Sequence, residues 1–148
     1  MISMASIAKH PVHPMLIPLP IGLWIFSLVC DIIMLSTGNP LWSILSLYTM
    51  AGGIIGALFA ALPGLVDLFT LNPSFVKRLG IWHMGVNLII VLLYVINFLW
   101  RREILTESAG PFILSLISVM LLGISGWLGG ELVYVHGVAV EPVGRQRL

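Results

Sequence analysis

Histidines are the residues in this chain whose type and spacing could do metal chemistry, and there are four of them. Two stand in the motif His-Pro-Val-His-Pro at residues 10–14, directly before the first long apolar run. Because proline restricts its own backbone and that of the preceding residue, we expect this motif to form an extended arm outside helical geometry. Imidazole nitrogens ligate haem iron, copper and zinc, so His10 and His13 are candidate metal ligands.

The elements that must position these histidines are membrane spans. Hydrophobic residues make up 59% of the 148 residues and charged residues only 9%, which excludes an ordinary soluble domain. Four apolar runs are each long enough to cross a hydrocarbon core of about 30 Å. We therefore predict an all-α membrane protein, an antiparallel bundle of four transmembrane helices with both termini on the same side. The helices are expected at residues 15–37, 41–66, 79–100 and 111–136, between an N-terminal His-Pro arm at 1–14 and a polar C-terminal tail at 137–148.

This topology brings all four histidines to one membrane face. His10 and His13 precede the first helix, His83 lies about one turn into the third, and His136 ends the fourth. Ionisable groups at membrane depth are costly and are usually functional or paired with one another. Asp67 and Glu131 emerge on the same face, where we expect them to be hydrogen-bond partners of the ligands.

The third helix carries a polar stripe that should face the bundle interior. At about 100° per residue, His83, Asn87, Tyr94 and Asn97 point in nearly one direction. The fourth helix offers a matching face of small residues, at Ser118, Ser125 and Gly129. A planar group could fit between the two faces.

These observations favour a b-type haem between histidines of different helices. His83 is the first expected ligand, with His13 or His136 opposite, and Asn87 and Asp67 would orient the rings. Lys77 and Arg78 would lie at the height of the haem propionates. Two alternatives stay open. In one, the four histidines bind copper or zinc, although no known zinc spacing is present. In the other, no cofactor binds, and His83 hydrogen-bonds Asp67 while the other histidines titrate in water.

Two further features predict helix packing. Asp31 is an acid inside the first apolar run, and we favour a structural pairing with another helix over a role in proton relay. The second run carries small residues four positions apart, which let a neighbouring helix approach closely. They are Gly52, Gly56, Ala60 and Gly64.

Several function classes have no support in the residues. A net charge of +1 without a basic run argues against nucleic-acid binding, and no nucleophile-base pair or phosphate loop suggests a hydrolase or kinase. Cys30 is the single cysteine, so an intrachain disulfide is impossible. Five basic residues fall on the side of the termini and two on the other side, which predicts cytoplasmic termini. The five are Lys9, Lys77, Arg78, Arg145 and Arg147, and the two are Arg101 and Arg102.

The chain resembles a bacterial membrane-protein family known as domain of unknown function 2231. The resemblance covers nearly the whole chain and rests on short motifs in combination: His-Pro-Val-His-Pro at 10–14, Leu-Pro-Ile-Gly at 19–22, Asp31, Leu-Pro-Gly-Leu-Val-Asp at 62–67, His83 with Asn87, and Leu-Gly-Gly-Glu-Leu at 128–132. Members are small four-helix proteins, sometimes fused to or encoded beside Rieske-type or cytochrome electron carriers. The resemblance implies a redox role with haem in the bacterial cytoplasmic membrane, with quinone or other membrane subunits as partners.

Overall fold

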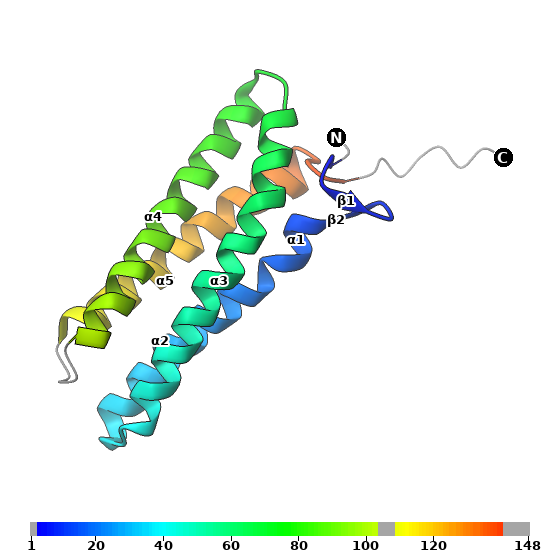
Figure 1. Cartoon of the computed structure of the whole chain (residues 1–148). Helices are drawn as coiled ribbons and strands as arrows, with labels where there is room; N and C mark the ends of the chain where they lie inside the picture. The colour runs from blue at the N-terminus through cyan, green and yellow to red at the C-terminus, as the bar shows by residue number, and fades with distance from the viewer. Residues whose placement is uncertain (1–2, 104–108, 141–148) are drawn as a thin grey trace.

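The computed structural model describes residues 3–103 and 109–140, most of which are helical (Figure 1). A short hairpin precedes the helices, and a π-helical turn, η1, extends the last one. The elements are β1 (Ser6–Ile7), β2 (His10–Pro11), α1 (Val12–Leu16), α2 (Pro18–Thr37), α3 (Leu41–Thr70), α4 (Phe75–Glu103), α5 (Ala109–Gly130) and η1 (Glu131–Val135). Within the described ranges, four segments are long and apolar enough to cross a membrane: Val12–Thr37, Leu41–Thr70, Phe75–Arg102 and Ala109–Val135.

The helices close into a four-helix bundle, which confirms the predicted fold. α2 packs along α3 and α4 along α5, while α3 contacts α4 and α2 contacts α5 to complete the ring. The hairpin and η1 lie at the same end of the bundle, and Ser3 and Ala139 line one cavity there (Figure 1). Many large apolar side chains on the outer faces are exposed, as expected for surfaces that meet lipid.

The N-terminal motif is more ordered than an extended arm. Ser6 pairs with Pro11 and Ile7 with His10 in the hairpin, whose turn places Ala8 and Lys9 at positive φ. The helix α1 then begins at Val12, so the prediction that the whole motif is non-helical was wrong. Pro14 lies in the first turn of α1, where a backbone N–H has no partner within the helix and its loss is tolerated.

Several helix ends differ by one to three residues from the predicted ones, and two differ by four. α3 runs through Pro63 to Thr70, four residues past the predicted end, and α4 begins at Phe75 instead of 79. A proline removes one intrahelical hydrogen bond, which a 30-residue helix packed along its length can tolerate. The predicted tail at 137–148 lies outside the described residues from 141 onward.

The small residues of α3 form the surface on which α1 and α2 pack, as predicted. A Cβ at Gly53 would lie 2.4 Å from Nε1 of Trp24, and one at Gly56 would lie 3.2 Å from a methyl carbon of Leu19. These glycines allow the backbones to approach where lipid supplies no hydrophobic drive for association.

The centre of the bundle is apolar and aromatic. Trp24, Met50, Ile90 and Tyr94 form its buried cluster. The rings of Trp24 and Tyr94 stack with centroids 4.3 Å apart and planes 7° from parallel, and Trp24 Nε1 donates to the Met50 carbonyl at 3.3 Å. This core separates a histidine cluster at one end of the bundle from an acid-base cluster at the other.

Removing the Tyr94 hydroxyl should not weaken the bundle. The hydroxyl is buried, and no hydrogen-bond partner for it lies within residues 3–103 and 109–140. An unsatisfied buried hydroxyl costs about 1–3 kcal/mol, so we expect Tyr94→Phe to leave the free energy of unfolding unchanged or to raise it by about 1 kcal/mol. Thermal unfolding in detergent micelles measures this. A loss of stability would show that the hydroxyl binds another group.

Candidate functional site

His13 is held against a notch in α3. Its Nδ1 lies 2.8 Å from the Ala60 carbonyl oxygen, and a Cβ on Gly64 would lie 2.8 Å from the same nitrogen. A carbonyl only accepts hydrogen bonds, so in the neutral ring the proton is assigned to Nδ1 and Nε2 carries the lone pair. The glycine therefore lets α1 dock its imidazole on the α3 backbone.

His83 is held in the same way between α4 and α5. Its Nδ1 lies 3.0 Å from the Ser125 carbonyl oxygen, and a Cβ on Gly129 would lie 3.1 Å from its Cε1. The Ser125 carbonyl again assigns the ring proton to Nδ1 and the lone pair to Nε2. Both rings thus use a backbone carbonyl of the neighbouring helix and a glycine one turn further along it.

Asn87 does not fully satisfy Nε2 of His83. Its amide nitrogen lies 2.7 Å from Ser125 Oγ, 2.8 Å from the His83 carbonyl oxygen and 3.2 Å from His83 Nε2. An amide group carries two protons, which the two shorter contacts use. The contact to Nε2 is the longest of the three, so it is the one that a further partner of Nε2 would displace most easily.

The two imidazoles lie close together although they come from different helix pairs. Their ring centroids are 6.4 Å apart, and their planes are 87° from parallel. Two imidazoles bound to one metal ion, with bonds of about 2.0–2.1 Å, hold their centroids about 5–6.5 Å apart. A metal-binding histidine also commonly donates its second nitrogen to a carbonyl. The separation of the two rings therefore falls in the range found for two histidine ligands of one centre.

The other predicted site residues lie elsewhere. His10 is exposed, with Nδ1 2.8 Å from the Ala8 carbonyl oxygen. His136 contacts the ring of Phe75, and its buried Nε2 lies 3.9 Å from Glu131 Oε1, too far for a hydrogen bond. No three His, Cys, Asp or Glu residues in the described ranges could hold a metal together. The donor set therefore does not fit a zinc site with three or four protein ligands.

Asp67 and Lys77 bond to groups other than the histidines, and Arg78 is exposed. The Asp67 carboxylate accepts hydrogen bonds from Ser3 Oγ at 2.7 and 2.9 Å and from the Ala5 N–H at 3.1 Å, which secures the N-terminal arm to α3. Lys77 donates from Nζ to the Leu71 carbonyl at 2.9 Å, and Arg78 is exposed. Asp67 thus positions His13 through the backbone of the arm, since the Val12 N–H donates to the Ala5 carbonyl at 2.9 Å.

At the opposite end of the bundle, Asp31 pairs with Arg101, which confirms the predicted structural pairing with another helix. Nη1 and Nη2 of Arg101 each lie 2.7 Å from one carboxylate oxygen. Ser46 Oγ donates to Asp31 Oδ1 at 2.6 Å. Asn97 and Ser115 accept from Arg101, so the cluster joins α2, α3, α4 and α5.

Sequence reasoning missed Arg101 as the partner because it treated this residue as a loop charge. A signal was present: Asn97, one turn earlier, belongs to the interior stripe of α4, so Arg101 continues the same face. The pairing of Arg101 with Asp31 could not be predicted, because the two residues lie far apart in the sequence and their contact depends on how each helix is rotated.

Comparison with known proteins shows the family. A model for the family described as Predicted membrane protein (DUF2231) matches residues 9–142. The chain belongs to this family. Comparisons with curated proteins and with solved structures gave no match. The matched range includes His13, His83 and all four spans of this chain.

Proposed function

We propose that this protein binds a b-type haem through His13 and His83 and transfers electrons within the membrane. The observation that carries the proposal is the pair of imidazoles 6.4 Å apart, each with Nδ1 on a carbonyl, with Nε2 of His83 held only by a 3.2 Å contact to Asn87. His13 and His83 would supply the two protein ligands that a b-type haem requires, whereas zinc would need further protein ligands. The donor set therefore fits haem.

The chain's own residues would hold and tune such a group. The Ala60 and Ser125 carbonyls fix the tautomer and orientation of the two rings, and Asn87 lies beside Nε2 of His83. Hydrogen bonding to Nδ1–H raises the basicity of the ligating nitrogen. When bound, haem iron supplies one-electron exchange between its ferrous and ferric states. Lys77 and Arg78, at the same end of the bundle, are available to anionic substituents.

The membrane setting supports a role in a redox assembly. Lys9, Lys77 and Arg78 lie near the histidine end, whereas Arg101 at the other end is neutralised by Asp31. In the bacterial cytoplasmic membrane that the resemblance implies, this bias favours an orientation with the histidine end and both termini in the cytoplasm. A quinone or another membrane subunit would exchange electrons with the site.

A cofactor-free accessory subunit is the second candidate. The histidines tie α1 to α3 and α4 to α5 through their Nδ1 bonds, and the glycines at 64 and 129 seat the rings closely. Such contacts would serve packing alone. Copper held by the same two Nε2 atoms is a non-haem version of the first proposal.

An optical spectrum of the purified protein tests the proposal. We expect sharp reduced α and Soret bands at one haem per chain, and their loss in His83→Ala and in His13→Ala, because each variant removes one axial ligand. His10→Ala is the matched control, since this histidine is exposed, and it should keep the full spectrum. A colourless protein from haem-replete cells would refute haem binding. Metal analysis of the same sample would then separate copper from the accessory role.

A further inference from the structure

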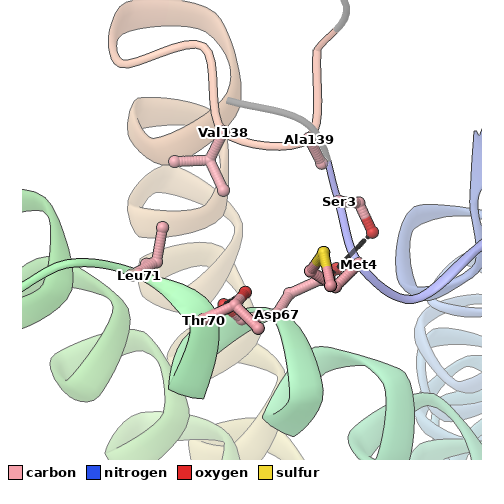
Figure 2. A pocket seen from close by; sticks show the side chains of 7 residues that line it. All are labelled: Ser3, Met4, Asp67, Thr70, Leu71, Val138 and Ala139. Atoms are coloured by element: carbon pink, nitrogen blue, oxygen red, sulfur yellow. Dashed lines mark hydrogen bonds between the residues drawn. The ribbon is translucent and has the colours of Figure 1, made fainter.

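We propose that the cavity beside Asp67 binds the headgroup of a zwitterionic phospholipid with a primary ammonium, namely phosphatidylethanolamine. The cavity has a volume of about 400 Å³ at the histidine end of the bundle (Figure 2). The N-terminal arm, the end of α3 and the segment after η1 surround it. Its walls include Ser3, Met4, Asp67, Thr70, Leu71 and Val138. The cavity lining includes neither His13 nor His83, although Asp67 also secures the arm that carries His13, and the proposal does not depend on a cofactor at the histidine pair.

One side of the cavity is suited to an ammonium group. The Asp67 carboxylate receives hydrogen bonds from two neutral donors, Ser3 Oγ and the Ala5 N–H, and its described contacts include no cation. A carboxylate has about four lone-pair directions, so it can accept further donors. Asp67 also lies in the last turn of α3, where the helix dipole favours a positive charge. A primary ammonium with three N–H donors matches this environment.

A cation for the phosphate is bonded to one of the lining residues. Leu71 lines the cavity, and its carbonyl oxygen accepts from Lys77 Nζ at 2.9 Å. An ammonium group has three donors, so two of those on Lys77 remain for a phosphate oxygen. Asp67 and Leu71 both line the cavity, and Lys77 is bonded to the Leu71 carbonyl, so a carboxylate for the ammonium and a cation for the phosphate lie at the same end of α3.

The surroundings suit a lipid better than a soluble amine. The cavity lies where the apolar span of α3 ends, and Val66 and Phe69 on that last stretch of the helix are 47% and 70% exposed. These exposed side chains provide apolar surface for acyl chains at the same end of α3. Met4 and Val138 add apolar walls around the headgroup itself.

Thermal unfolding in lipid nanodiscs tests the proposal. For the unmodified protein, we expect phosphatidylethanolamine in a phosphatidylcholine disc to raise Tm by about 3–6 °C. The gain should fall stepwise as the headgroup nitrogen is methylated, because each methyl group removes an N–H donor. An equal Tm across the methylation series would overturn the proposal, and so would an equal gain from water-soluble phosphoethanolamine added to phosphatidylcholine discs.

Two variants test whether Asp67 and Lys77 bind the charged groups of the lipid. Asp67→Asn keeps an oxygen acceptor for Ser3 and Ala5 but removes the negative charge, and Lys77→Gln removes the positive charge without touching the arm. Both should lose most of the Tm gain. Lys9→Gln is the matched control, because Lys9 is exposed in the hairpin turn, and it should keep the gain. A full gain in both Asp67→Asn and Lys77→Gln would contradict the site.

Discussion

Replacing Arg101 with methionine is expected to lower the free energy of unfolding by about 3–5 kcal/mol, because it leaves the buried Asp31 carboxylate without its cation. Asp31 is 5% exposed and sits between α2, α3 and α4. The five N–H groups of Arg101 reach Asp31, Ser46, Asn97 and Ser115, so one substitution removes the hydrogen bonds that link α4 to α2, α3 and α5 through this side chain. A fall in Tm of about 10 °C in detergent micelles would measure this loss.

The neighbouring arginine provides the matched control. Arg102 is exposed, with its guanidinium 5.9 Å from the ring centroid of Phe98, and Arg102→Met should change stability by at most about 1 kcal/mol. The double variant Asp31→Asn with Arg101→Met should be more stable than Arg101→Met alone, since no unpaired charge remains. Equal effects of the two single arginine variants would refute a structural role for the ion pair.

Gly53→Ala should destabilise the protein by about 2–3 kcal/mol, although alanine is a better helix former than glycine. The added Cβ would lie 2.4 Å from Nε1 and 2.5 Å from Cδ1 of Trp24. The indole cannot move aside cheaply, because it is 2% exposed, stacks on Tyr94 and donates to the Met50 carbonyl. Overpacking of the core and loss of the Trp24 hydrogen bond both lower the free energy of unfolding.

Substitution of a second glycine, Gly22, should have the opposite effect on stability. Gly22 lies in α2 with no neighbouring atom within 4 Å of an added Cβ, so Gly22→Ala should raise stability by up to about 1 kcal/mol through helix propensity. Thermal unfolding and near-ultraviolet circular dichroism of the two variants make the comparison. If Gly53→Ala left the stability unchanged, α2 and α3 would be able to move apart at the core without a loss of free energy.

Much of the fold followed from local patterns. The apolar runs predicted four spans, and the small residues of α3 predicted the packing face that now contacts Leu19 and Trp24. The predicted end of α3 shortly after Pro63 was wrong. A proline removes only one intrahelical hydrogen bond, and the tertiary contacts of the whole helix decide whether it continues.

The candidate site was less predictable than the fold. The sequence placed the histidines at one membrane face, but it left open which of them meet. The structure pairs His13 with His83 and leaves His10 and His136 apart. In the structure, the Asp67 carboxylate accepts hydrogen bonds from the N-terminal arm instead of from a histidine.

By itself, the sequence determined the membrane class, the number of spans, the small-residue packing face and the need of Asp31 for a partner. These properties depend on composition and on periodicity within one segment, where the bilayer acts as a uniform solvent. Only the tertiary structure decided that the partner is Arg101, 70 positions away, and that His83 meets the Ser125 carbonyl, 42 positions away. Such pairings depend on how each helix is rotated and shifted against its neighbours. One residue of register turns a side chain by about 100°, so contacts along the whole helix must fix it.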